Sequence, residues 1–266
     1  MTDYKICPIT EKPMKPAFSE KILRKYNVTY YFSEESGMLQ TETPYWLDEA
    51  YQSAISCQDT GVVRRNISNS KILEPALCIF CNPNARFLDI GGGYGLLTRL
   101  MRDIGFDFYT LDPYCENLFA KTFEPTDEFK AEALTAFEVL EHIENPKVFL
   151  ETYFKKYHTR TILFSTLTFK EPIPDRNWWY YSFESGQHIS FYQPKTLDLL
   201  AKIFGCKYYM ISPEFHVITD KNISPFKYLI MRNRHSFTIY SAYIRYIRKN
   251  LSKTWEDHAA MKSKQN

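Results

Sequence analysis

Short apolar runs alternate with amphipathic stretches through residues 76–220. Runs of this kind, bounded by turn-forming residues, predict buried strands, and the stretches between them have the apolar spacing of helices. The alternation indicates an α/β domain with a mostly parallel sheet and crossover helices. The predicted strands are 86–90, 108–111, 134–137, 161–165, 207–211 and 215–219.

Two regions precede this domain. Residues 1–44 are polar segments interrupted by prolines, and the run Val-Thr-Tyr-Tyr-Phe at 28–32 predicts one strand of a small hairpin. Residues 45–75 are predicted to be helical because apolar side chains recur at helical spacing. The residues that set this spacing are Trp46, Leu47, Ala50, Tyr51, Ala54 and Ile55.

Residues 221–266 form a basic tail. They hold ten Lys and Arg against two acids, a balance of +8, so the rest of the chain carries −6 (23 basic against 29 acidic) of the net +2. We expect a terminal helix that packs on the domain with a solvated basic face. Peripheral contact with an anionic membrane, or with nucleic acid, is the alternative. The apolar residues predicted to share one helical face are Tyr240, Ile244, Ile247, Leu251 and Trp255.

The composition is that of an ordinary globular protein. The 266 residues (31.5 kDa) are 44% hydrophobic and 24% charged, which excludes wholesale disorder. No apolar run reaches the roughly 18 residues that a membrane span needs, and the start lacks the apolar core of a signal peptide. Six scattered cysteines without a disulfide framework suit a reducing compartment. We therefore expect a cytoplasmic protein.

Glycines cluster after the first predicted strand, in the pattern Asp89-x-Gly91-x-Gly93-x-Gly95 with Gly92 between. Glycines at a strand-to-helix turn let the backbone approach a ligand closely. The dinucleotide fingerprint G-x-G-x-x-G fails here because Leu96 stands where its third glycine belongs. A Walker loop fails as well, since no Gly-Lys-Ser/Thr follows.

The pattern resembles the first motif of class I S-adenosylmethionine (SAM)-dependent methyltransferases. Asp112 ends the next strand 23 residues after Asp89, where the resemblance implies a carboxylate that holds the ribose, and 134–146 resembles the family's fourth-strand segment. The resemblance implies a Rossmann-like seven-stranded sheet with helices on both faces, over about residues 80–220. It also implies a methyltransferase with SAM as cofactor. The implied contacts in this core are Asp89, Gly91, Gly92, Gly93, Gly95, Asp112 and Glu138.

The segments around Tyr45–Tyr51 and 59–65 resemble the lid over the cofactor in related methyltransferases. The resemblance makes Tyr51 and Arg64, or Arg65, candidates to meet the cofactor carboxylate, Arg through a charge-assisted pair. A capping helix with a solvated Arg pair is the alternative interpretation.

His188 is the candidate catalytic base, because neutral imidazole accepts a proton near pH 7. The run 187–192 is similar to a segment of deoxysugar C-methyltransferases whose histidine is the base. Gln187, Ser185 and Gly186 depart from that pattern, so O-methylation is favoured over C-methylation. A histidine that only hydrogen-bonds its loop is the alternative. Substrate stacking is predicted for Trp178 and Trp179, with Tyr192 beside them, although core use is an equal alternative.

The segment Glu138-x-x-Glu141-His142 has a second interpretation. It resembles the divalent-metal site of ubiquinone-pathway and small-RNA 2′-O-methyltransferases, with His188 as a fourth ligand. On a helix the three residues would share a face. Metal-free methyltransferases have similar residues here, so we expect no metal, and a metal site stays the alternative.

Cys7-x-x-Thr10 and Ser33-x-x-Ser36 have the spacing of two zinc-ribbon knuckles with three of four sulfurs replaced. Such ribbons accompany some sugar methyltransferases. One Cys with Thr and Ser cannot hold Zn²⁺ tetrahedrally, so we expect the hairpin to persist without metal.

The sequence as a whole predicts four regions: a vestigial ribbon-like hairpin (1–44), a helical lid (45–75), a methyltransferase domain (76–220) and a basic helical tail (221–266). The predicted acceptor is a small molecule, a sugar or nucleotide-sugar methylated on a hydroxyl or a carbon, and we do not expect a nucleic-acid partner. Two alternatives are a metal-assisted nucleic-acid 2′-O-methyltransferase and a SAM-binding protein without turnover.

Overall fold

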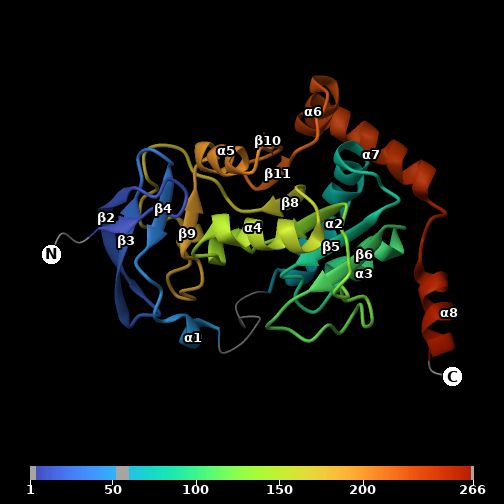
Figure 1. Cartoon of the computed structure of the whole chain (residues 1–266), viewed down its shortest axis with the longest axis horizontal. Coiled ribbons are helices and arrows are strands. Elements are labelled where there is room, and N and C mark those ends of the chain that lie inside the picture. Colours follow the sequence, from blue (N-terminus) through green and yellow to red (C-terminus); the bar gives the residue numbers. More distant parts are fainter. Residues whose placement is uncertain (1–3, 52–59, 265–266) are drawn as a thin grey trace. The chain divides into compact units, whose positions relative to one another are not determined.

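The computed structural model describes residues 4–51 and 60–264 (Figure 1). The chain divides into two compact units. Unit 1 comprises Met1–Ser56, Ala136–Lys156 and Arg160–Asp220, and unit 2 comprises Cys57–Thr135, Tyr157–Thr159 and Lys221–Asn266. Part of the helix predicted over 45–75, residues 52–59, lies outside the described residues. No helix among the described residues is both long enough and apolar enough to cross a membrane.

Unit 1 contains a five-stranded antiparallel sheet rather than the small hairpin expected from residues 1–44. Its strand order is β1-β2-β3-β4-β9, and β9 comes from far along the chain. Leu39 pairs with Phe191, and both are fully buried. β9 is three residues long, so its sequence carries no recognisable alternation. The strands are β1 Lys5–Ile6, β2 Pro13–Ile22, β3 Tyr26–Phe32, β4 Met38–Thr41 and β9 Ser190–Tyr192.

Aromatic side chains form the core against this sheet. Tyr30 on β3 packs edge-on against Tyr181, which is itself fully buried. The Trp46 indole donates a hydrogen bond to the Gly186 carbonyl at 2.8 Å. These contacts anchor Tyr181 and Gly186 of the segment 180–189.

The chain also forms a six-stranded sheet of order β10-β11-β8-β7-β5-β6. β5 runs parallel to its neighbours β6 and β7, whereas β11 runs antiparallel to its neighbours β10 and β8. The mixed α/β class is as predicted, but the predicted seven strands are wrong. The described residues 112–132, between β6 and β7, form turns and contain no apolar run of strand length. The strands are β5 Arg86–Ile90, β6 Asp107–Leu111, β7 Ala133–Ala136, β8 Ile162–Ser165, β10 Lys207–Met210 and β11 Phe215–Thr219.

Capping residues and amphipathic faces account for several helices. Leu97 and Met101 form the buried face of α3. Helix α5 begins with Pro194 in its first turn, and the preceding residue, Gln193, forms a capping box with Thr196. The helices in the first part of the chain are α1 Leu47–Ala50, α2 Val62–Phe80, α3 Leu96–Asp103, α4 Pro146–Tyr157 and α5 Pro194–Ile203, with 3₁₀ turns η1 Leu140–His142 and η2 Trp179–Tyr181.

The tail is three helices rather than one: α6 Pro225–Arg232, α7 Arg234–Arg248 and α8 Thr254–Lys264. Asn233 interrupts the helical chain because its side chain accepts a hydrogen bond from the Ser236 N–H as an N-cap. The apolar residues predicted to share one face are therefore divided. Ile244 is buried, whereas Trp255 on α8 is 81% exposed.

A buried ion pair holds α8 on unit 2. Arg102 of α3 donates to both carboxylate oxygens of Asp257 at 2.8 and 2.6 Å, and also pairs with Asp107. We expect Asp257→Asn to lower the free energy of unfolding by about 1–2 kcal/mol, because the amide keeps the shape but loses a charge-assisted contact. Urea denaturation at neutral pH measures this loss. An unchanged midpoint would show that the pair does not stabilise the fold.

Candidate functional site

The glycine loop of unit 2 lies between the end of β5 and the start of α3. Gly91, Gly93 and Gly95 have φ values of 67°, 55° and 82°. Side chains avoid this left-handed region, so these positions favour glycine and give the loop its shape.

Gly92 is constrained by space rather than by its dihedral angles. A Cβ atom added there would lie 2.2 Å from Thr110 Oγ1 and 2.8 Å from Asp89 Oδ2. Both distances are below any real Cβ contact. The loop backbone therefore packs directly on two polar side chains from neighbouring strands, and only glycine fits between them.

Asp89 lies at the base of this loop and is only 3% exposed. The Thr135 hydroxyl donates a hydrogen bond to Asp89 Oδ1 at 2.5 Å. Burial raises the pKa of Asp89 to about 7; the hydrogen bond from Thr135 opposes this shift, and the nearby Asp112 adds to it. The Asp89 carboxyl is thus poised to lose its proton when a positive charge approaches.

Asp112, just beyond β6, lies against the same loop. Its Oδ2 accepts a hydrogen bond from the Gly93 N–H at 2.9 Å, and its Oδ1 accepts from the Tyr114 and Cys115 N–H groups at 2.8 and 3.1 Å. Unit 2 therefore brings together the predicted cofactor residues Asp89, the glycines and Asp112. The sequence did not indicate Thr110 or Thr135, since a threonine in a strand carries no distinguishing signal.

The other predicted cofactor residues have surroundings of their own. Arg64 is exposed on α2 of unit 2. Tyr51 in unit 1 places its hydroxyl 2.8 Å from His142 Nδ1. Glu138, also in unit 1, has a φ of 55°, and its Oε1 accepts a hydrogen bond from the Ser165 hydroxyl at 2.6 Å. A positive φ at a non-glycine residue is costly, and strained residues of this kind cluster at functional sites.

Unit 1 gathers Glu141, His142 and His188 into one group. One ligand atom from each residue lies within 4.8 Å of the others. His188 Nδ1–H donates to the Tyr180 carbonyl at 2.7 Å, which leaves Nε2 with its lone pair. Burial lowers the pKa of His188, so the ring is neutral at pH 7.

The two other members are more deeply buried. Burial lowers the pKa of His142 to about 3, with His188 as a smaller cause, and His142 Nδ1 lies 2.9 Å from the Gln187 carbonyl. Burial also raises the pKa of Glu141 to about 8, and the neighbouring Glu138 adds to this shift. Among the described residues neither Glu141 oxygen has a hydrogen-bond partner in good geometry, although the Tyr180 and Thr166 hydroxyls partly oppose the shift.

These three residues fit a divalent ion. Two imidazoles and a carboxylate with both oxygens unpartnered are a ligand set of the catalytic zinc type. A ring N–H that donates to a backbone carbonyl, as in His188, is the usual support for a metal-binding histidine. The predicted ligand set needs one correction. Glu138 is not in the group, because η1 begins only at Leu140 and the Glu138 carboxylate binds Ser165 instead.

A family model described as "Methyltransferase domain" matches residues 64–210. The chain belongs to this methyltransferase family. The predicted family and enzyme class are therefore confirmed. No curated protein matches the sequence.

Several solved methyltransferases are similar to parts of this chain. Human N-acetylserotonin methyltransferase in complex with SAM is 13% identical, with a TM-score of 0.43 over 66% of this chain and 66% of that one. CalO1, a methyltransferase in calicheamicin biosynthesis bound to S-adenosylhomocysteine, is 14% identical, with a TM-score of 0.44 over 60% and 56%. An O-methyltransferase family protein from Burkholderia thailandensis is 13% identical, with a TM-score of 0.47 over 67% and 68%. The chain spans less than two thirds of the first two proteins.

The predicted substrate residues of this methyltransferase have different environments. Trp179 is 73% exposed, and Trp178 is half-buried among aromatic side chains. Tyr192 is fully buried in β9, and its hydroxyl donates to the Leu140 carbonyl at 2.7 Å. Tyr192 therefore stabilises η1, and its role as a substrate contact stays a prediction.

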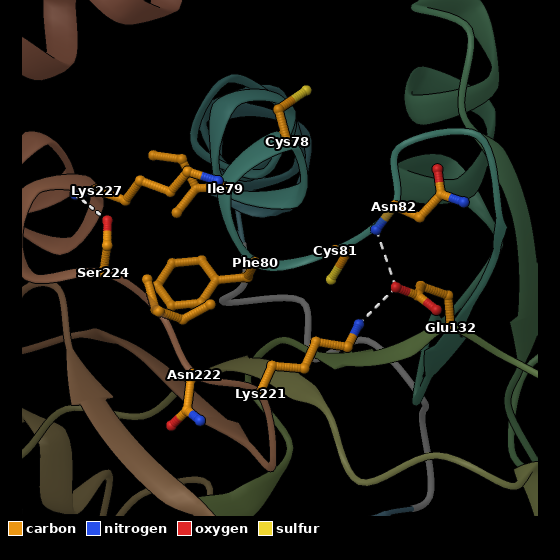
Figure 2. A pocket seen from close by; sticks show the side chains of 11 residues that line it. Cys78, Ile79, Phe80, Cys81, Asn82, Glu132, Lys221, Asn222, Ser224 and Lys227 are labelled. Carbon is orange, nitrogen blue, oxygen red and sulfur yellow. Dashed lines mark hydrogen bonds and ion pairs between the residues drawn. The ribbon is translucent and has the colours of Figure 1, made fainter.

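A pocket of about 440 Å³ in unit 2 contains none of the predicted site residues (Figure 2). It lies where α2 ends and α6 begins. Lys221 pairs with Glu132, whose carboxylate also accepts from the Asn82 N–H at 2.9 Å. Cys81 lines this pocket as well, and burial raises the pKa of its thiol to about 12. The thiol is therefore protonated and unreactive at neutral pH.

The buried Glu141 carboxyl gives this methyltransferase a measurable pH dependence. The unfolded chain loses this proton near pH 4.5, whereas the folded protein keeps it to about pH 8. Folding binds a proton in that window, so stability falls as pH rises through it. We expect Glu141→Gln to be more stable than the parent at pH 8 by about 1–2 kcal/mol, less than the pKa shift implies because the amide is also buried unpaired. Denaturant midpoints of both proteins from pH 5 to 8 measure this difference. If the midpoint changed with pH equally in the parent and in Glu141→Gln, the prediction would be contradicted.

Proposed function

We propose that this methyltransferase transfers the methyl group of SAM to a hydroxyl of a sugar or nucleotide-sugar, with His188 as general base. The observation that carries the proposal is the hydrogen bond from His188 Nδ1 to the Tyr180 carbonyl. It fixes the tautomer and orientation of the ring, so that Nε2 is available to accept the acceptor's proton.

The cofactor is SAM, and the glycine loop of unit 2 binds it. SAM carries a sulfonium and an ammonium group but no phosphate. Asp89 and Asp112 supply negative charge beside the loop, and the close approach of backbone at Gly92 suits a ligand held against it. Asp112 would hold the ribose hydroxyls. Tyr51, Arg64 and Glu138 are further cofactor contacts in this proposal.

The reaction is a displacement in which the acceptor oxygen attacks the methyl carbon as the carbon–sulfur bond breaks. The electron pair of that bond stays on sulfur, which leaves as the neutral thioether S-adenosylhomocysteine. The hydroxyl proton passes to His188 Nε2. Because the sulfonium is already a good leaving group, the protein contributes mainly alignment and this proton transfer.

A hydroxyl acceptor is favoured over a carbon acid because Gln187, a neutral amide, precedes His188. The exposed Trp179 offers a flat apolar face on which a sugar ring can stack. Both features suit a polyhydroxylated small molecule.

Native mass spectrometry of the purified protein, followed by a screen of nucleotide-sugar acceptors with isotope-labelled SAM, tests the proposal. We expect bound SAM or S-adenosylhomocysteine and labelled O-methyl product. A protein that binds NAD in place of SAM would refute the cofactor. SAM binding with no product, and unaltered by His188→Ala, would favour the alternative of a SAM-binding protein without turnover.

Metal-assisted 2′-O-methylation of nucleic acid is a second candidate, favoured by the group Glu141, His142 and His188. These residues would hold a divalent ion, which would polarise the acceptor hydroxyl. The two candidates differ in what His188 does, since a metal ligand cannot also be the base. Elemental analysis and activity after chelation distinguish them. Loss of activity that Zn²⁺ or Mn²⁺ restores would replace the base mechanism.

A further inference from the structure

Helix α7 presents two opposite faces with different roles. Ser241, Ile244 and Arg248 are buried at helical spacing, on the side that packs in unit 2. On the opposite face Ile239, Tyr243 and Tyr246 also follow one another at helical spacing, and all three are exposed. A surface helix normally carries polar residues on its outer face. The apolar outer face of α7 is therefore unexplained by the packing of the unit.

Helix α6, which packs against α7, also exposes apolar side chains on its outer face. Phe226 and Leu229 lie one turn apart and are 72% and 62% exposed, whereas Met231 is the residue that α6 buries. We call the outer faces of these two helices the α6–α7 surface. Its apolar residues are Phe226, Leu229, Ile239, Tyr243 and Tyr246.

The charge of this segment has one sign. Residues 221–255 contain eight Lys and Arg and no Asp or Glu. Four of the eight have partners in the chain. Lys221 pairs with Glu132, Arg245 pairs with Glu74, Arg248 donates to the Gly105 carbonyl, and Lys253 pairs with Glu256.

Four exposed cations remain on α6 and α7 or directly after α7. Lys249 lies 5.0 Å from the centre of the Tyr246 ring, so charge and aromatic surface are adjacent. Among the residues that the structure describes, none of the four has a carboxylate partner within ion-pair distance. The four are Lys227, Arg232, Arg234 and Lys249.

We propose that the α6–α7 surface docks the enzyme on an anionic lipid bilayer. Such a membrane offers the two environments that the surface needs, because acyl chains receive the apolar side chains while headgroups meet the cations. Tyrosine suits this boundary, since its ring is apolar and its hydroxyl stays hydrated. Nucleic acid would match the cations but would leave Phe226, Leu229 and Ile239 in water.

Vesicle co-sedimentation of the full chain tests this proposal. We expect binding to vesicles of phosphatidylglycerol and phosphatidylcholine in equal amounts, and much weaker binding to phosphatidylcholine alone. Added salt should weaken the binding, because it screens exposed charges.

Two triple variants and a matched control locate the surface. Lys227→Gln, Arg232→Gln and Lys249→Gln together should lower the partition coefficient about a hundredfold, at about fivefold for each cation. Ile239→Ser, Tyr243→Ser and Tyr246→Ser together should abolish the part of vesicle binding that persists at high salt. The control removes three exposed cations that lie outside the segment, Lys130→Gln, Lys155→Gln and Lys170→Gln, and should bind like the parent.

Circular dichroism confirms that each variant remains folded. Failure of the parent to bind anionic vesicles would overturn the proposal. A loss of vesicle binding in the control variant as large as that in the α6–α7 cation variant would overturn it as well. A short duplex RNA that binds tightly whether or not the apolar residues are present would show that the surface fits nucleic acid instead. If the parent dimerises but does not bind vesicles, and the serine variant no longer dimerises, a second copy of the chain covers the α6–α7 surface instead of a membrane.

Discussion

His188→Ala is expected to lower kcat by about 10²–10⁴-fold, the usual contribution of a positioned general base. The substitution removes the only group proposed to take the acceptor proton and leaves the glycine loop of unit 2 untouched. SAM affinity should therefore stay within about twofold of the parent. Isothermal titration with SAM and steady-state kinetics with the acceptor from the screen measure the two quantities separately.

The pH profile of the parent gives a second readout of the same residue. The neutral ring is the active form, and burial lowers the pKa of His188 below its ordinary value of 6.5. Activity should therefore persist below pH 6.5 and fall only as the pH drops through the lowered pKa. An acid limb centred above that value would contradict the proposed role.

His258→Ala is the matched control, because His258 is an exposed histidine on α8. Its kinetics should equal those of the parent. If His188→Ala lowers SAM affinity and stability but leaves kcat unchanged for the protein that remains folded, the residue only supports its loop through Tyr180. Conversely, full activity with His188→Gln would show that hydrogen bonding to the loop is its whole contribution.

The sequence predicted those parts of the site whose geometry is set by residues close together along the chain. The glycine loop was recognisable because Gly91, Gly93 and Gly95 meet a local need for positive φ, directly between a strand and a helix. Asp112 was recognisable because it directly follows the next strand. Local chemistry of this kind is visible in one stretch of sequence.

The parts that the sequence missed depend on long-range packing. β9 exists because Ser190–Tyr192 pairs with β4, about 150 positions earlier, and three residues carry no pattern of their own. The group of Glu141 and His188 forms because the Ile189 N–H donates to the Glu141 carbonyl. The predicted helical face with Glu138 failed because the chain takes a positive φ there and begins only a short 3₁₀ turn.

Each unit thus contains one buried acid at its candidate site. Burial raises the pKa of Asp89 to about 7 and that of Glu141 to about 8. A buried carboxyl without a cation destabilises the fold in its charged form, so such groups concentrate at functional sites. Asp89 lies beside a loop that suits a cationic ligand, and Glu141 lies beside two histidines. In our proposal the two acids accept positive charge in different ways, Asp89 from the cofactor and Glu141 from a proton or a metal ion.

Gly92→Ala is expected to weaken SAM binding by about a hundredfold, since a displacement near 1 Å at a binding site costs this much. The added methyl carbon would lie 2.2 Å from Thr110 Oγ1, so the loop must move outward or the threonine must turn. Neither change is easy in a buried strand. Isothermal titration with SAM measures the loss, and urea denaturation shows whether the variant remains folded.

Two further variants separate a local clash from general damage. Gly205→Ala places a methyl group at a positive φ of 64° in open space, so it should cost some stability without changing SAM affinity. The double variant Gly92→Ala with Thr110→Ala removes the shortest contact, and part of the affinity should return, although the 2.8 Å approach to Asp89 Oδ2 remains. If Gly92→Ala bound SAM as tightly as the parent, the cofactor would have to bind away from this loop. The raised pKa of the buried Asp89 at the base of this loop would then need an explanation other than a bound cation.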